Sequence, residues 1–213
     1  MSFPIRARTI ALGAGAVIAL TACASNPVHY YTLVSPGTST STTAPATTAR
    51  AAAPLAINVL PVGIPAQLDQ QQMVVRSGTG TALILDNERW VAPLGDELRA
   101  ALSSALVEQL GARNVTGLPR PSNQTVMSIR TQVRRFDAWP GSMARFEADW
   151  VVAVQQDTPG TRISCSTRLS EAAPGGYADM VRVQQRMIEQ FATRIASTVH
   201  SFGDGRPACP ADS

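Results

Sequence analysis

Residues 145–154 read Arg145-Phe146-Glu147-Ala148-Asp149-Trp150-Val151-Val152-Ala153-Val154, with an apolar side chain at every second position from Phe146 onward. Period two indicates a β-strand with one buried and one solvated face. Two flanking segments repeat the pattern, with apolar positions at Met127, Ile129 and Val133, and at Ile163, Cys165 and Leu169. Pro140-Gly141 and residues 157–160 supply turns. We therefore predict a three-stranded antiparallel meander.

Two segments have a helical period instead. In residues 94–110 the leucines recur at helical spacing, Asp96 and Glu97 occupy the first turn, and Gly111 follows as a C-terminal cap. In residues 177–202 the apolar stripe comprises Met180, Val183, Met187, Ile188, Phe191, Ile195 and Val199. Segments 55–61, 73–76 and 81–85 have strand character. Two helices covering one face of a mostly antiparallel sheet bury both stripes, so we predict an α+β two-layer sandwich.

Residues 1–22 have the features of a lipoprotein signal peptide. Arg6 and Arg8 give a basic start, an apolar stretch follows, and Leu20-Thr21-Ala22-Cys23 matches a lipobox. The apolar stretch is shorter than the roughly 20 residues that a transmembrane helix needs. We expect removal of residues 1–22 and lipidation of Cys23. Ordinary cleavage after Ala24 is the alternative, and it would release a periplasmic protein that lacks Cys23.

The residue after the lipidated cysteine bears on the choice of membrane. In the enterobacterial sorting scheme an aspartate at that position retains a lipoprotein at the inner membrane, whereas this chain has Ala24. We therefore expect a lipid-anchored protein at the outer membrane of a Gram-negative bacterium, facing the periplasm.

Charge and composition exclude several classes of protein. All 18 basic residues are arginines, and two are lost with residues 1–22, so 16 remain against 15 acidic residues, a formal charge of +1. Such a balance is unlike that of a nucleic-acid-binding domain. Because the chain contains no lysine, Schiff-base catalysis, a Ser-Lys dyad and a Walker A phosphate loop are excluded.

Composition also divides the chain after the signal peptide. Residues 35–54 consist almost entirely of Ser, Thr, Ala, Pro and Gly, which cannot bury enough apolar surface to order themselves. We assign 23–54 as a lipid-anchored N-terminal segment containing the linker 35–54, 55–204 as the folded domain, and 205–213 as a C-terminal tail. The linker is either a tether or a long loop between a first strand and the remainder of the domain.

Lipidation of Cys23 would leave Cys165 and Cys209 in an oxidising compartment. A disulfide between them would strap the tail to the sheet, a stabilisation on the order of 4 kcal/mol in the chain-entropy model. The alternative is two unpaired thiols.

Side chains suited to catalysis are sparse. The two histidines, His29 and His200, accompany no Gly-x-Ser-x-Gly elbow and no metal-ligand spacing. Glu147 and Asp149 share the polar face of a strand, where ion pairing with Arg145, Arg162 and Arg168 is a commoner use than acid–base chemistry. We expect no enzymatic activity, no cofactor and no metal.

The stretch between the lipobox and the first helix carries a recognisable pattern. Tyr30-Tyr31-Thr32-Leu33 comes first, and residues 55–94 then contain Leu68-Asp69, Gln72, Val74, Arg76, and Arg89-Trp90 followed by Pro93-Leu94. This pattern resembles the ABC-type transport auxiliary lipoprotein family. The predicted order of helices and strands extends the likeness over nearly the whole mature chain.

The resemblance implies a non-catalytic component of an intermembrane lipid-transport system. It would dock an MCE-domain protein and an inner-membrane ABC permease and ATPase at the outer membrane, and so support envelope integrity. The expected contact surface comprises Leu68, Asp69, Gln72, Arg76, Arg89 and Trp90, with Trp90 either interfacial or part of the core. A ring-like homo-oligomer would suit this role. The alternative function is a structural lipoprotein of outer-membrane or cell-wall assembly, unrelated to lipid transport.

Overall fold

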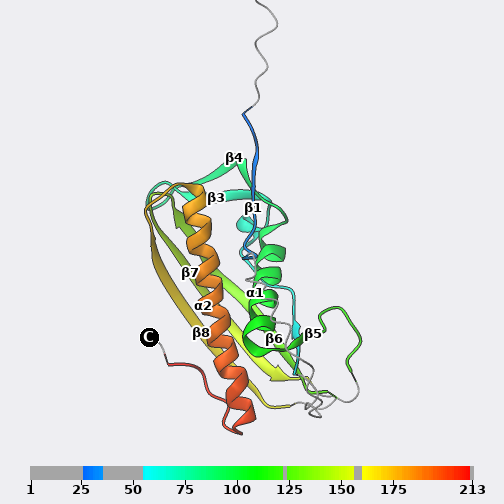
Figure 1. Cartoon of the computed structure of the whole chain (residues 1–213). Helices are drawn as coiled ribbons and strands as arrows, with labels where there is room; N and C mark the ends of the chain where they lie inside the picture. Colours follow the sequence, from blue (N-terminus) through cyan, green and yellow to red (C-terminus); the bar gives the residue numbers. More distant parts are fainter. Residues whose placement is uncertain (1–25, 36–54, 122–123, 156–159, 212–213) are drawn as a thin grey trace, which may run out of the picture.

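A computed structural model describes residues 26–35, 55–121, 124–155 and 160–211 (Figure 1). The expected lipid site Cys23, residues 36–54 of the linker and most of the turn at 157–160 lie outside these ranges. The elements in chain order are β1 (His29–Tyr31), β2 (Ala56–Val59), the 3₁₀ turn η2 (Ala66–Leu68), β3 (Gln72–Arg76), β4 (Ala82–Trp90), α1 (Leu94–Leu110), β5 (Arg113–Asn114), β6 (Val126–Trp139), β7 (Ser142–Val154), β8 (Arg162–Ala173) and α2 (Tyr177–Gly203).

Five strands form the larger sheet, in the order β5-β2-β6-β7-β8. β6, β7 and β8 are antiparallel neighbours, which confirms the predicted meander, and β2 runs parallel to both β5 and β6. Phe146 lies opposite Phe136 on one side and Leu169 on the other, so the alternating apolar positions share one face. The β6–β7 hairpin turns at Gly141, whose φ of 79° favours glycine.

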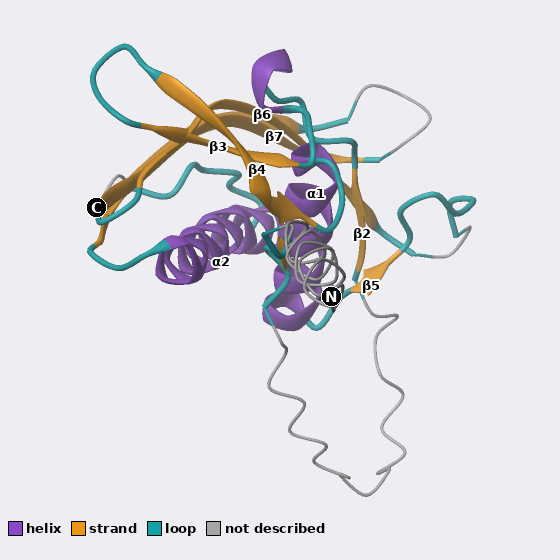
Figure 2. Cartoon of the chain, turned by 90° about the horizontal axis from the view of Figure 1, so that it is seen from above, coloured by secondary structure: helices purple, strands orange, loops and turns teal. Residues whose placement is uncertain are grey.

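Both helices pack on the same face of this sheet (Figures 1 and 2). α2 contacts β7 and β8, while α1 contacts β2 and β5. The predicted apolar stripe of α2 is buried along its whole length. α1 ends at Gly111 in the left-handed conformation, with the glycine N–H donating to the Val107 carbonyl oxygen, so the predicted cap is confirmed. The predicted α+β fold with two helices on one sheet face is also confirmed.

Aromatic rings connect the layers in the core. Phe191 of α2 lies 5.0 Å from Phe146 and 6.1 Å from Trp150, measured between ring centroids. Phe136 lies 6.2 Å from Phe146 and 6.5 Å from Trp90. Burial of a large apolar side chain stabilises a fold by about 1.5–3 kcal/mol. This chain of contacts therefore joins the end of β4 firmly to the main core.

A second sheet, which the sequence pattern does not predict, has the order β1-β4-β3. β3 and β4, which cover the predicted strand segments 73–76 and 81–85, form a hairpin in which the Ser77 N–H donates to the Thr81 carbonyl oxygen at 3.2 Å. β1 pairs with the other edge of β4 in the parallel sense, with Tyr30 opposite Arg89. Met73 and Val75 are buried against the core, so this small sheet is half covered by the body of the domain.

Glu97, in the first turn of α1, holds the segment that follows β1. Its side chain is buried, and its carboxylate accepts hydrogen bonds from the Thr32 hydroxyl at 2.8 Å, the Leu33 N–H at 2.9 Å and the Ala92 N–H at 3.2 Å. Gln185 of α2 donates to the Thr32 carbonyl oxygen at 2.9 Å. The chain is therefore fixed between the two helices as it leaves β1.

β1 and the buried Leu33 thus lie within the folded domain, whereas the boundary expected at residue 55 leaves them outside it. Ser35 and Leu55, which border residues 36–54, both lie against the folded domain. The segments on either side of residues 36–54 therefore both pack against the folded domain.

A disulfide joins Cys165 of β8 to Cys209 of the C-terminal tail, with the two Cα atoms 5.7 Å apart. Ala208 fastens the same tail to α2, because its N–H donates to the Ser201 hydroxyl and its carbonyl oxygen accepts from the Thr198 hydroxyl, each at 3.0 Å. Of the two alternatives for these cysteines, the structure contains the disulfide.

Replacement of Glu97 by alanine should lower the free energy of unfolding by about 2–4 kcal/mol, because buried backbone N–H groups lose a charged acceptor. Urea denaturation followed by circular dichroism measures this change. Glu108→Ala, at an exposed position of the same helix, is the matched control and should change stability by less than about 0.5 kcal/mol. Equal effects of the two substitutions would contradict the role assigned to Glu97.

The double variant Cys165→Ala/Cys209→Ala should be less stable than the parent by about 2–4 kcal/mol, because the disulfide closes a loop with a sequence separation of 44 residues. Thermal unfolding of both proteins, with and without reductant, measures the difference. Reductant should destabilise the parent and leave the double variant unchanged.

Candidate functional site

The six residues expected to contact a partner divide into buried and accessible positions. Leu68 is 6% exposed and Trp90 is 3% exposed, so both belong to the hydrophobic core. Asp69 is exposed, and Gln72, Arg76 and Arg89 are half-buried. The four polar members of the set therefore remain accessible to a partner. Trp90 is part of the core and not of an exposed interface.

Gln72 and Arg89 lie on the outer face of the small sheet. The strand register places Arg89 opposite Gln72 on one side and Tyr30 on the other, so the three residues form one row across the sheet. Val74 and Ile84 make a second pair, in which Ile84 is exposed and Val74 is partly buried against the core. Tyrosine and arginine near an exposed aliphatic side chain are a composition found at binding surfaces.

Arg76 links the small sheet to the large one. Its Nε atom lies 2.9 Å from Oδ1 of Asp137 on β6, and Oδ2 of the same carboxylate lies 3.5 Å from Nε of Arg135. The Asp137 side chain is only 11% exposed, and such a charge needs partners to be tolerated. Arg76 therefore has a structural role at the border between the sheets.

The face of the large sheet opposite the helices carries mostly exposed or half-exposed side chains, apart from the end of β6, where Arg76 and Gly78 contact Asp137 and Trp139, and we call it the open face. Its charged residues are Arg130, Arg134, Arg135, Asp137, Arg145, Glu147, Asp149, Arg162 and Arg168. Six arginines against three carboxylates give this face an excess of three positive charges. The alternation in the sequence places most of these residues on the polar side, as observed.

The two carboxylates discussed above as an acid–base pair are used in ion pairs. Asp149 lies 2.7 Å from Arg134, and Glu147 lies 3.7 Å from Arg135. Ion pairing is confirmed, but the partners expected were Arg145, Arg162 and Arg168. Both arginines come from β6 because the ladder with β7 is irregular between Val133 and Arg135, and that irregularity exposes two consecutive arginine side chains.

Three arginines of the open face have no carboxylate partner among the described residues: Arg130, Arg162 and Arg168. Arg145 instead lies over the ring of Trp139, 5.4 Å from the ring centroid. Unpaired guanidinium groups on a rigid sheet can form bidentate hydrogen bonds with carboxylates of another molecule. This cluster was not singled out as a site from the sequence, although its polar alternation was recognised there.

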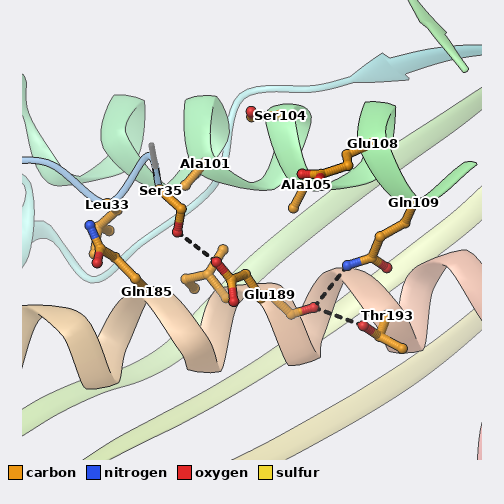
Figure 3. A pocket seen from close by; sticks show the side chains of 11 residues that line it. Leu33, Ser35, Ala101, Ser104, Ala105, Glu108, Gln109, Gln185, Glu189 and Thr193 are labelled. Atoms are coloured by element: carbon orange, nitrogen blue, oxygen red, sulfur yellow. Dashed lines mark hydrogen bonds between the residues drawn. The ribbon is translucent and has the colours of Figure 1, made fainter. Parts of the chain in front are cut away.

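A groove of about 500 Å³ lies between α1 and α2 (Figure 3). Its lining includes Ala101 and Ala105 of α1, which are small enough to leave room beside α2. The Ser35 hydroxyl donates to the Glu189 carboxylate at 2.6 Å, and Gln109 donates to the Glu189 carbonyl oxygen at 3.2 Å. These hydrogen bonds satisfy polar groups of the rim internally. The groove is thus the place where the chain crosses the helical layer after β1.

The two histidines lie apart from each other. His29 Nδ1 lies 2.9 Å from Glu88 on the small sheet, whereas His200 lies in the last turn of α2. Among the described residues, no group of three or more His, Cys, Asp or Glu side chains is placed to hold a metal ion.

A family model for the ABC-type transport auxiliary lipoprotein component matches residues 31–196, from the end of β1 into α2. The chain belongs to this family. It is therefore an auxiliary lipoprotein component of an ABC-type transport system. No helix in the described ranges combines the length and the apolar character needed to cross a membrane.

Solved structures show the same fold. A crystal structure of an uncharacterized protein has a TM-score of 0.61 and 22% sequence identity, covering 82% of this chain and 99% of its own. A protein from Xanthomonas campestris has a TM-score of 0.54 and 15% identity, covering 71% and 86%. A search of curated proteins found no match.

The contacts of β1 have a consequence for pH dependence. Burial and the carboxylate of Glu88 raise the pKa of Tyr31 to about 12, from 10.0. Because the folded state binds this proton more tightly than the unfolded state, the stabilisation is fully present below pH 10 and is lost as the pH rises through about 12.

The variant Tyr30→Phe/Tyr177→Phe leaves Tyr31 as the only tyrosine, so its phenol can be titrated by ultraviolet absorbance. The midpoint should be near pH 12 in the folded protein and near 10 in urea. Adding Glu88→Gln should lower the folded midpoint, because a negative charge beside the phenol is removed. A folded midpoint near 10 would refute the assigned environment of Tyr31.

Proposed function

We propose that this auxiliary lipoprotein is a non-catalytic docking component of an MCE-type intermembrane lipid-transport system. A lipid on Cys23 holds it at the outer membrane, facing the periplasm, where it binds an MCE-domain protein and, through that protein, the inner-membrane ABC permease and ATPase. Membership of the family supports the transport role. The sequence pattern from Tyr30 to Leu94 supports the narrower assignment to lipid transport.

The open face is the observation that carries the docking role. β6, β7 and β8 are long, well-paired strands, so the side chains on this face are held rigidly. Arg130, Arg162 and Arg168 project from it without an internal partner among the described residues. Charged residues at the rim of an interface set orientation and speed association more than they raise affinity. The partner therefore presents an acidic surface to this face.

The accessible residues that the family resemblance predicts as partner contacts extend the open face. Arg76 meets Asp137 at the border of the open face, and Gln72, Arg89 and Asp69 continue from it over the small sheet and η2. Leu68 and Trp90 support this region from the core, where their burial positions the strands that carry the polar residues. A partner that covers the open face could thus also contact Arg76.

Several observations support a role in binding, not turnover. His29 is engaged with Glu88, and the paired carboxylates Glu147 and Asp149 are neutralised by arginines. The groove between the helices is bordered by hydrogen bonds that the protein makes with itself. Surfaces that are rigid, and whose polar groups already bond within the protein, suit a protein that holds other proteins in position.

The variant Arg130→Ser/Arg162→Ser/Arg168→Ser should recover about tenfold less MCE-domain protein when the lipidated chain is purified from solubilised membranes. The measurement is quantitative mass spectrometry of proteins that co-purify through an affinity tag. The matched control, Arg99→Ser/Arg182→Ser/Arg194→Ser, removes the same charge from the helical layer and should recover parental amounts. Circular dichroism verifies that both variants are folded.

Two outcomes would count against the proposal in different ways. Equal recovery by the two variants would reject the open face as the docking surface. Recovery of other envelope proteins, but of no MCE-domain protein, by the unmodified chain would reject the lipid-transport assignment and favour a structural role in envelope assembly.

A further inference from the structure

Exposed apolar side chains gather at one end of the molecule. Among the described residues, the large apolar side chains that are exposed are Val28, Tyr30, Leu83, Ile84, Val91 and Leu118, and all but Leu118 lie in or next to the small sheet. Figure 1 shows the small sheet at the end where the chain enters through β1, opposite the end where α2 finishes. We call Val28, Tyr30, Leu83 and Ile84 the apolar tip.

β4 connects the two parts of the tip. β1 pairs in parallel with the last three residues of β4, Glu88 to Trp90, so Val28 and Tyr30 lie beside that part of the strand, whereas Leu83 and Ile84 lie near its start, next to the β3–β4 hairpin. The two strands thus contribute apolar side chains to one end. Large exposed apolar groups that gather on a folded domain indicate a contact with another phase or molecule.

The length of chain outside the structure limits what can cover this tip. Val28 is five residues from Cys23, and five residues span at most about 17 Å even when fully extended. The headgroup layer of a bilayer is itself roughly 5–8 Å thick. A lipid on Cys23 would therefore keep the small sheet next to the membrane surface, with no room for a folded protein between the tip and the bilayer.

The chemistry of the tip suits that location. Tyrosine is enriched at membrane–water interfaces, where its ring lies among headgroups and its hydroxyl stays hydrated, and Tyr30 is 60% exposed. Ile84, at 59%, offers an aliphatic side chain to the acyl boundary.

We propose that the apolar tip rests on the lipid bilayer that carries the anchor, at the headgroup and acyl boundary, and thereby fixes the orientation of the domain. This inference rests on the proposed lipidation of Cys23. With the tip on the membrane, the long strands of the large sheet extend away from the bilayer. The open face then points sideways along the membrane surface, accessible to a partner that spans the periplasm.

The experiment compares two positions of matched exposure, Ile84 in the tip and Leu118, at 57%, in the loop after β5. The lipidated full-length chain, carrying either Ile84→Trp or Leu118→Trp, is bound to vesicles of phosphatidylethanolamine and phosphatidylglycerol that contain brominated phosphatidylcholine. Quenching of the added indole, corrected for that of the parent protein, should be about threefold or more stronger for Ile84→Trp.

Equal quenching of the two variants on vesicles that retain the protein would overturn the membrane contact while leaving the anchor intact. If mass spectrometry finds no lipid on the mature protein and its flotation equals that of Cys23→Ser, both the anchor and this inference are overturned.

A third experiment measures capture of the MCE-domain protein by the variant Tyr30→Ser/Ile84→Ser, with Val91→Ser/Leu118→Ser as control. Loss of MCE capture by the first pair, with equal quenching at the two indole positions, would show instead that the tip binds protein.

Discussion

The buried carboxylate of Glu97 is the interaction on which the arrangement of the N-terminal half depends. It lies in the first turn of α1, where the helix dipole favours a negative charge, and it accepts hydrogen bonds from both Thr32 and Leu33. A buried charge is tolerated only when its hydrogen-bonding capacity is used. The helix and the incoming chain therefore depend on each other, and without this contact β1 would be held by its short ladder with β4, the hydrogen bond from Gln185 and the burial of Leu33.

The rest of the molecule distributes its roles around that fixed entry point. The helical layer seals one face of the large sheet, so the opposite face is left for charged side chains and for partners. The small sheet carries the apolar tip at the end where the chain enters through β1, while the disulfide between Cys165 and Cys209 secures the tail at β8. On the function proposed above, these surfaces would divide the binding of membrane and of protein between them.

Patterns that are local in the sequence were predictable, and those that depend on distant pairing were not. The meander and α2 follow from their own periodicity, because each buries a face that its own residues define. The separation of β1, β3 and β4 into a second sheet depends on pairings such as His29 with Glu88, 59 residues apart, which no local pattern records. Asp96 and Glu97 look alike as first-turn acids, yet only Glu97 is buried, because only it faces the returning chain.

The direction in which β1 is paired has a mechanical consequence. β1 runs parallel to β4 and enters the core at Leu33, so a pull on its N-terminal end acts along the strand and transverse to the evenly spaced, slanted hydrogen bonds of the ladder. All bonds of the ladder, together with those of Glu97, then share the load in shear and do not open one after another. If the chain bridges a lipid anchor and a partner, as proposed, displacement of the two would put tension on this strand, whose geometry is suited to bear it.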